Sequence, residues 1–324
     1  MPSQSSIWAK LVCEAGGFRN RSIHFRFTDG AEAVLPVFSG SPLLGPLTIS
    51  RSPPAAWGFG GPISSRPLGP GHIRLILDHC AALPGAGIQI RPNPRAADVW
   101  TQAAQGSGWD RLHRTAHILD LSGGFDTVWN ERFAPRSRSA ARKAERAGIT
   151  IDSGSHDDLA VEFDGLFRLS IARWARKQNE SARLAAFRAH LRDPRRKFLH
   201  MARQSGGIVR ISIARRAGRP IAGIVVLYGR NAHYTRGAMD EQEVGNSGAN
   251  HLLHRIAIAE ACDRSCRFYH MGETGASTSL ANFKEGFGAA PVPYAEYRHE
   301  RIPVMSTNQH LRSIVKKAIG FRDA

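Results

Sequence analysis

The sequence predicts an α/β protein with two domains, each a mixed β-sheet flanked by helices. The chain has 324 residues, which suggests two domains at about 100–200 residues each. Its first third is rich in strand-like segments, whereas its second half alternates strands with helices. We place the boundary near residues 148–155. This gives domains over residues 1–150 and 151–305, followed by a basic C-terminal helix over residues 306–324.

The N-terminal third combines short strands with a long loop. Alternating residues between Ser5 and Phe38 predict two or three strands, and His72–Ala82 has the apolar spacing of a helix. Residues 39–70 are rich in glycine, proline and serine, which predicts a loop. Long ordered loops are often functional, so Trp57 and Phe59 are candidates for a substrate-binding wall. The alternative is that these two rings pin the loop to the core.

A helix predicted over residues 125–147 becomes strongly basic after Pro135. Arg138, Arg142 and Arg146 recur every four residues and therefore share one helix face, with Lys143 beside them. Aligned arginines without acidic partners repel one another. Either this face is simply solvated, or a polyanion contacts it and relieves the repulsion.

The charge balance favours an anionic partner. Lys and Arg number 44 against 27 Asp and Glu, a formal charge of +17. Nucleic acid, a nucleotide-linked acceptor or an anionic membrane surface would fit this charge, although a coding bias toward arginine would also produce it. The sequence has no apolar run of about 18 residues and no signal peptide, so we expect a cytoplasmic protein without an integral membrane segment. The basic C-terminal helix, His310–Ala324, either packs on the body or lies on a membrane surface, and packing is the favoured alternative.

The four cysteines do not form a disulfide framework in a chain of this size. Cys262, Cys266 and His270 are spaced four apart, but they offer only three ligands on elements that need not converge. We therefore expect no metal.

The stretch from His270 to Gly288 is the candidate catalytic segment. A loop of small polar residues, which includes Ser277, leaves room for a substrate and precedes a short helix. Phe283 and Phe287 share one face of this helix, with Lys284 between them. Lysine held in this way can project its charge into a cleft, although a solvated lysine is the simpler alternative.

This segment resembles a known family. Residues 282–288, NFKEGFG, followed by PVPY at 291–294, resemble the F-K-x-x-F-G signature of Fem-type aminoacyl transferases, relatives within the GNAT superfamily. Residues 138–149 resemble the basic helix of that family, and the likeness extends from Phe125 to Arg298. The resemblance implies two tandem GNAT-like acyltransferase domains, the first of them degenerate. It also implies that Lys284 acts at the reacting centre as a charge stabiliser.

The resemblance also implies the donor. CoA-dependent GNAT enzymes hold the pyrophosphate on a Q/R-x-x-G-x-G/A loop before a helix, where this chain has Glu243 and a different glycine spacing. Gly245, Asn246 and Ser247 still form a candidate phosphate site at that helix N-terminus. Fem-type enzymes take the acyl group from aminoacyl-tRNA and need no metal or other cofactor. The departure at Glu243 therefore favours tRNA over CoA.

Amide formation requires an oriented acceptor and one proton acceptor. Arg236 is a candidate clamp for a phosphate or carboxylate of the acceptor, and Glu273 is a candidate proton acceptor, unless it forms only a structural salt bridge. The leading hypothesis is aminoacyl transfer from tRNA to an amine of a peptidoglycan precursor or a small natural product. The alternatives are an acyl-CoA-dependent N-acyltransferase and a non-catalytic nucleic-acid or envelope-binding module.

Overall fold

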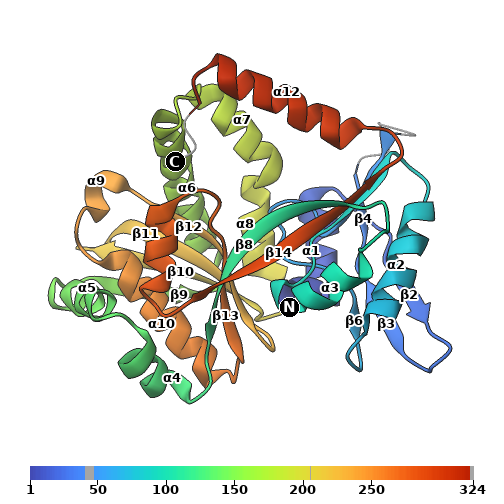
Figure 1. Cartoon of the computed structure of the whole chain (residues 1–324). Helices are drawn as coiled ribbons and strands as arrows, with labels where there is room; N and C mark the ends of the chain where they lie inside the picture. Colours follow the sequence, from blue (N-terminus) through green and yellow to red (C-terminus); the bar gives the residue numbers. More distant parts are fainter. Residues whose placement is uncertain (41–46, 205, 322–324) are drawn as a thin grey trace. The chain divides into compact units, whose positions relative to one another are not determined.

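The computed structural model describes residues 1–40, 47–204 and 206–321, which form two compact units (Figure 1). Unit 1 comprises Met1–Pro2, Ala116–Pro291 and Ile319–Ala324, and unit 2 comprises Ser3–Thr115 and Val292–Ala318. The boundary expected near residues 148–155 lies within unit 1. The chain instead changes unit after Thr115 and after Pro291, because residues 116–120 pair with a strand of unit 1 and residues 297–300 with a strand of unit 2.

The sheet of unit 1 is mixed, as the sequence predicts. Its strands lie in the order β8, β13, β12, β11, β10, β9, and only β12 and β13 are parallel. Their bounds are β8 Asp110–Asp120, β9 Thr150–Gly154, β10 Val209–Arg216, β11 Arg219–Leu227, β12 Ala232–Met239 and β13 Phe268–Glu273. The run Ile221–Leu227 of β11 is buried throughout, which indicates that helices cover both faces of the sheet.

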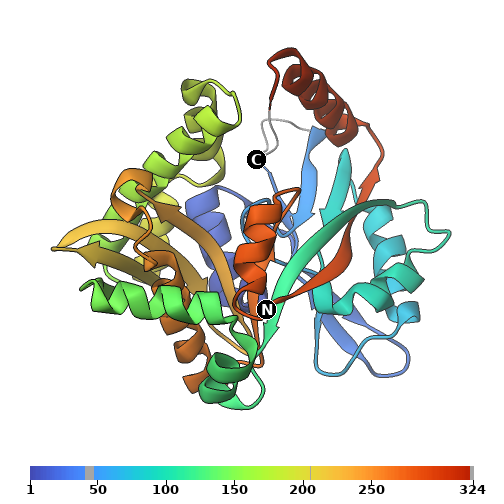
Figure 2. The same ribbon diagram turned by 60° about the vertical axis from the view of Figure 1, so that its left-hand side comes forward.

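Helices of unit 1 lie on both faces of this sheet (Figures 1 and 2). Ile224 and Val226 of β11 share a core with Leu252 and Leu253 of α10, whereas the Gly223 Cα faces Phe163 of α6. Successive strand residues point to opposite faces, so α10 and α6 cover opposite sides. The helices are α4 Gly124–Thr127, α5 Pro135–Arg146, α6 Asp157–Lys177, α7 Ala182–Arg192, α8 Arg195–Gln204, α9 Glu241–Val244, α10 Ala249–Asp263 and α11 Thr278–Glu285.

The basic helix forms where the sequence predicts it, but with a break before it. Residues Val128–Arg132 form a π-helical turn after α4, and Pro135 starts α5 at the position where its missing N–H costs nothing. Gly148, with φ +70°, follows the helix in the left-handed conformation and ends it. The Ala134 N–H donates to the Gly286 carbonyl over 2.9 Å, which fixes the start of α5 beside the end of α11.

Unit 2 is also a mixed sheet with helices. Its main strands lie in the order β1, β4, β5, β7, β14, with β5 and β7 parallel, and a second sheet has the order β2, β3, β6. The strand bounds are β1 Arg19–Asn20, β2 Ile23–Arg26, β3 Glu32–Leu35, β4 Phe38–Ser39, β5 Ile49–Ser52, β6 Ile63–Ser64, β7 Gly87–Ile90 and β14 Ala290–Glu300. The helices are α1 Ser6–Gly16, α2 Pro70–Ala82, α3 Ala97–Ala103 and α12 Val304–Ala318, with 3-10 turns at Pro2–Gln4 and Pro94–Ala96.

The strands predicted between Ser5 and Phe38 are present, but they begin only at Arg19, because residues 6–16 form α1. The Ser5 side chain accepts from the Trp8 N–H and caps the helix, and Gly17 ends it in the left-handed conformation. Trp8, Leu11, Val12 and Ala15 are buried at helical spacing. These caps and this packing outweigh the weak alternation that predicts a strand.

The sequence favours packing of the C-terminal helix on the body, but this helix does not bury its apolar side. Leu311, Ile314 and Val315 of α12 are exposed. In the part of the chain that the structure describes, no helix is long and apolar enough to span a membrane.

Candidate active site

The site is built where β12 and β13 separate. Their pairing covers Ala232 with Tyr269 and His233 with His270. Beyond it, β12 contains a bulge, because Thr235 is an extra residue between Tyr234 and Arg236, which pair with neighbouring residues of β11. Such bulges increase the local twist and are common beside active sites. The segment Gly272–Thr274 forms the end of β13 and leads toward α11.

Two phenylalanines fix the end of α11 in the core, but only Phe283 lies on the helix, because α11 ends at Glu285 and Phe287 follows it. Phe287 is fully buried, and its ring packs edge-on against Phe283 and Phe133 at centroid distances of 5.0 and 5.2 Å. Ser277 caps the other end, since its Oγ accepts from the Leu280 N–H. The predicted substrate-binding residue Ser277 therefore has a structural role in the helix cap.

Lys284 is buried, so the expectation of a lysine charge projecting into an open cleft is wrong. Its side chain is only 2% exposed. Its Nζ donates to the Gly272 carbonyl over 3.0 Å, to the Glu273 carbonyl over 2.7 Å and to Thr274 Oγ1 over 3.3 Å. A lysine ammonium has three N–H donors, and these three acceptors engage all of them. Lys284 therefore clamps the Gly272–Thr274 segment and has no remaining N–H to donate to an oxyanion.

Burial also changes the pKa of Lys284. Desolvation lowers the pKa of the Lys284 ammonium to about 8, while the negative charge of Glu273 opposes the shift. Glu273, the predicted proton acceptor, thus lies close enough to Lys284 to interact with it electrostatically. The clamp also fixes the main chain of Glu273 through its carbonyl.

His117 and Thr274 belong to the site although the sequence pattern did not indicate them. Thr274 Oγ1 lies 2.7 Å from His117 Nδ1, and His117 Nε2 lies 3.4 Å from Glu285 Oε1. Because Lys284 donates to the Thr274 hydroxyl, this hydroxyl donates onward to Nδ1, which leaves the imidazole proton on Nε2 facing Glu285. Burial lowers the pKa of His117, Glu285 opposes this shift and Lys284 adds to it. The result is a directed polar chain from Lys284 to Glu285.

A buried histidine lines the other side of α11. His254 of α10 packs against Phe283 and Phe287, and its Nδ1 lies 3.2 Å from the Tyr269 hydroxyl. Burial lowers its pKa to about 3, with His251 and Lys284 adding to the shift. His254 is therefore neutral near pH 7 and holds α11 by packing.

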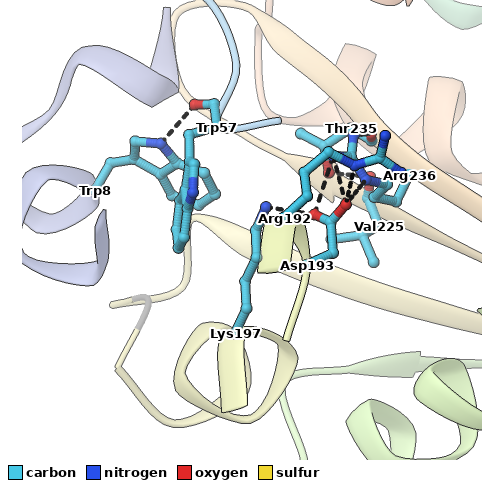
Figure 3. A network of polar contacts seen from close by, with 8 residues as sticks. All are labelled: Trp8, Trp57, Arg192, Asp193, Lys197, Val225, Thr235 and Arg236. Carbon is cyan, nitrogen blue, oxygen red and sulfur yellow. Dashed lines mark hydrogen bonds and ion pairs between the residues drawn. The ribbon is translucent and has the colours of Figure 1, made fainter. Parts of the chain in front are cut away.

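Arg236 does not form the open clamp predicted for the acceptor. Its Nη2 donates to both carboxylate oxygens of Asp193 over 3.0 Å, and Lys197 Nζ donates to Asp193 Oδ1 over 2.7 Å (Figure 3). Burial by itself raises the pKa of the Asp193 carboxyl, but Lys197, Arg236 and Arg192 hold it below its usual range. The arginine thus ties β12 to the turn between α7 and α8.

Trp57 and Phe59 lie in the core of unit 2. This is the alternative in which the two rings pin the loop to the core. The Trp8 indole N–H donates to the Trp57 carbonyl over 2.8 Å, and the two rings pack edge-on. Phe59 is held by the Ser3 hydroxyl and packs against Tyr294. Both rings are buried and pin the loop, so they do not form a solvent-facing wall.

The basic face of α5 lines a hollow on the surface of unit 1. The hollow has a volume of about 490 Å³ and is lined by Pro135, Arg138, Ser139, Arg142, Glu145 and Arg146. Arg142 stacks over Trp129 at 5.5 Å and Glu145 pairs with Arg255 of α10. Arg138 differs from its neighbours, because its guanidinium donates to the carbonyls of Trp129, Asn130 and Phe133. Lys143 is exposed on the same helix.

The predicted phosphate site at the start of α10 is partly closed. Ser247 is buried, and its Oγ accepts from the Ala249 N–H, the first of the helix. Gly248 lies against α5 so closely that a Cβ there would meet the Ala140 carbonyl oxygen at 2.2 Å, and its φ is +78°. Gly245 and Asn246 are exposed. The helix N-terminus is therefore partly closed by Ser247 and by the backbone of α5.

The cysteines show no sign of a metal centre. Cys266 is buried and its thiol donates to the Gly229 carbonyl, while His270 lies in the interior of β13. Among the residues that the structure describes, no three His, Cys, Asp or Glu side chains form a group that could hold a metal ion.

Comparisons with known proteins agree with this architecture. Residues 132–285 match the acetyltransferase (GNAT) domain family. The fold is similar to that of FemX, with a TM-score of 0.65, 14% identity and coverage of 97% of this chain and 94% of FemX. No curated protein matches the sequence.

Two further solved structures share the fold. The C-terminal domain of a candidate lysylphosphatidylglycerol synthetase from Agrobacterium fabrum has a TM-score of 0.52, 10% identity and coverage of 99% of this chain and 93% of that one. A conserved protein of unknown function from Bacteroides thetaiotaomicron has a TM-score of 0.53, 9% identity and coverage of 83% and 84%. The chain is therefore an acyltransferase of the GNAT fold, with a GNAT acetyltransferase domain over residues 132–285 and the architecture of FemX.

Proposed function

We propose that the protein transfers an aminoacyl group from aminoacyl-tRNA to an amine acceptor and so forms an amide. The observation that carries this proposal is the position of α5. This helix presents Arg142, Lys143 and Arg146 to solvent beside a hollow of about 490 Å³, while its backbone closes on Gly248 at the start of α10. Helix α5 thus covers the N-terminus of α10, where a phosphate could bind, and offers a basic surface of its own. Such a surface suits an extended polyanion.

The same arrangement disfavours CoA. A helix N-terminus binds phosphate through its unsatisfied N–H groups. Here the Ala249 N–H is taken by Ser247 Oγ, and the Ala140 carbonyl lies against Gly248. Glu243, at the end of the short helix α9, adds a negative charge next to this loop. A pyrophosphate at this point would meet the Ala140 carbonyl where it needs a donor.

Amide formation from an aminoacyl ester depends mainly on how the two substrates are oriented. An acceptor amine attacks the ester carbonyl of the aminoacyl-tRNA, a C–N bond forms, and the C–O ester bond breaks. The attacking nitrogen gives up one proton to a base, and one proton is returned to the terminal ribose oxygen as it leaves. We assign the base to Glu273. Lys284 is a positioning residue in this mechanism, because it holds the main chain of Glu273 through the 2.7 Å hydrogen bond to its carbonyl.

The acceptor is an amine of a peptidoglycan precursor or of a small natural product. An acyl-CoA-dependent N-acyltransferase is the second candidate function, since the matching family model describes acetyltransferases. A non-catalytic nucleic-acid or envelope-binding module is the third. It differs from the others in that the wild type would bind its ligand but transfer no acyl group to an amine.

Ligand-induced stabilisation separates the donors. A ligand that binds only the folded chain stabilises it by RT ln(1 + [L]/Kd) and so raises its melting temperature. Charged tRNA should raise the melting temperature, and CoA at the same concentration should not. The double substitution Arg142→Glu with Arg146→Glu should abolish the tRNA effect. The matched control carries the same charge change at Arg19 and Arg21, two exposed arginines of unit 2. Stabilisation by CoA in the α5 variant as well as in the wild type would support the acyl-CoA alternative instead.

A further inference from the structure

Helix α7 of unit 1 carries an apolar stripe on its exposed side. Leu184, Phe187 and Leu191 follow one another at three- and four-residue steps and are 44%, 60% and 68% exposed. The opposite side of the helix, Ala185 and Ala189, is buried. Scattered exposed leucines need no explanation, but a row of large apolar side chains on one helix face marks an interaction surface.

Basic residues flank the stripe on α7. Arg183, Arg188 and Arg192 lie on the helix, and its residues 182–192 include no acid. The acids that border it are turned inward: Glu180 pairs with Arg188, and Asp193 pairs with Arg192 and Arg236. The surface of the helix therefore offers apolar and cationic groups and no exposed carboxylate.

Helix α12 of unit 2 has the same composition. Leu311, Ile314 and Val315 share one side of the helix and are at least half exposed. Arg312 and Lys316 lie on one flank of this stripe and Lys317 on the other. The sequence from Arg301 to Phe321 contains no aspartate or glutamate. Two helices, one in each unit, thus combine an exposed apolar stripe with cationic flanks.

We propose that α7 and α12 dock the protein on an anionic lipid bilayer. An amphipathic helix with this pattern lies in the plane of the membrane interface, its apolar side in the acyl boundary and its basic groups at the lipid phosphates. Each helix by itself would bind weakly and reversibly, and the attraction of its lysines and arginines to anionic lipid adds to the apolar term.

The two other occupants suit the helices less well. A second copy of the chain would bring the basic flanks of α7 or α12 against basic flanks, and like charges in contact oppose association. Nucleic acid would satisfy the cations but would leave the apolar stripes in water, because phosphates offer them no partner. An anionic bilayer provides for both features at once.

Co-sedimentation of the full chain with lipid vesicles tests this proposal. One set of vesicles contains phosphatidylcholine alone, and the other contains equal parts of phosphatidylcholine and phosphatidylglycerol. The variants are Phe187→Ser with Leu191→Ser on α7, and Leu311→Ser with Ile314→Ser on α12. The matched control is Leu75→Ser with Leu169→Ser, which removes one comparably exposed leucine from each unit outside both stripes.

The wild type and the control should sediment with the phosphatidylglycerol vesicles and remain in solution with phosphatidylcholine alone. Each stripe variant should bind the anionic vesicles at least roughly tenfold more weakly, because two apolar side chains no longer enter the bilayer. Unchanged circular dichroism and melting temperature would show that the variants fold.

Three results would overturn the proposal. The wild type could fail to bind either kind of vesicle. The anionic vesicles could bind the wild type and both stripe variants equally well. Binding would then depend on the net charge of the protein and not on the apolar stripes. Light scattering could also show a dimer that the stripe variants dissociate, which would assign the stripes to a second copy.

Discussion

Lys284 and His117 share the hydroxyl of Thr274. Lys284 donates to Thr274 Oγ1 over 3.3 Å, and His117 Nδ1 lies 2.7 Å from the same atom on its other side. The lysine belongs to α11 and the histidine to β8, so one threonine hydroxyl joins two elements that are distant in the sequence. The segment that carries Glu273 is thereby held from both sides.

Lys284→Met should reduce both stability and rate. The change leaves the Gly272 and Glu273 carbonyls without their donor, which should lower the free energy of unfolding by about 1–3 kcal/mol. Transfer should slow by roughly a hundredfold, because small misplacement of reacting groups costs that much. Urea unfolding and single-turnover kinetics measure the two effects. Lys177→Met, which removes an exposed lysine paired with Glu241, should change neither. A variant at Lys284 that loses rate with no loss of stability would restore a direct catalytic role for the ammonium.

Stability should depend on pH through Lys284. Its pKa is about 8 in the folded chain and 10.5 ordinarily. Between these values the unfolded chain binds a proton at this lysine that the folded chain does not, so the contribution of Lys284 to stability rises with pH. Below pH 8 the lysine is charged in both states, and the folded state carries the cost of burying that charge.

This effect is isolated by comparing the stability of the wild type with that of Lys284→Met. The comparison runs from about pH 8 to about pH 10, the pH at which ordinary tyrosines begin to ionise. The wild type should gain stability relative to the variant across this range. Lys197, whose pKa is also lowered to about 8 by burial, contributes equally to both proteins and cancels. Parallel stability curves would show that Lys284 stays charged throughout.

Phe287→Ala should destabilise the protein by about 3–5 kcal/mol, because it removes a fully buried ring from the core that anchors α11. Phe187→Ala is the matched control, since Phe187 is exposed on α7 and its removal leaves no cavity. Thermal and urea unfolding should show a large loss for the first variant and a negligible one for the second. Equal losses would contradict the packing described for α11.

The basic face of α5 should determine how tRNA binding depends on salt. For every phosphate that a variant no longer neutralises, the slope of log K against log salt should fall by about 0.7–0.9. Arg142→Glu and Arg146→Glu should each weaken binding and flatten this slope. Arg138→Glu should also lower stability, because its guanidinium holds three carbonyls at the π-helical turn. Filter binding at several salt concentrations measures the slopes. An unchanged slope in the Arg142 and Arg146 variants would make this face a solvated surface.

The elements that the sequence predicted well are those whose pattern is local. The four-residue spacing of Arg138, Arg142 and Arg146 placed the basic helix, which follows from helical geometry alone. Phe283 and Phe287 were also named together, but Phe287 lies beyond the end of α11. The helix α1 was missed because its evidence is in its caps, Ser5 and Gly17, and in packing that a weak alternation concealed.

The site was only partly predictable because its contacts are long-range. His117 lies 157 positions before Thr274, and no local pattern connects them. The burial of Lys284 depends on where Gly272–Thr274 runs, and that course is set by the pairing of β13 with β8. Arg236 was named as a candidate clamp for the acceptor, but its partner Asp193 comes from the turn between two helices. Candidate residues could be named from the sequence, whereas the partners that decide their roles could not.

Single-turnover transfer to an amine acceptor, measured with charged tRNA and with acyl-CoA as the donor, tests the proposed function most directly. The protein should transfer the aminoacyl group from charged tRNA, and the rate should fall strongly in Glu273→Gln, because the attacking nitrogen then lacks its base. It should also fall in the double variant of Arg142 and Arg146 at subsaturating tRNA. Acyl-CoA should give no transfer, since Ser247 and the α5 backbone partly close the start of α10. Transfer from acyl-CoA and none from charged tRNA would contradict the proposed function.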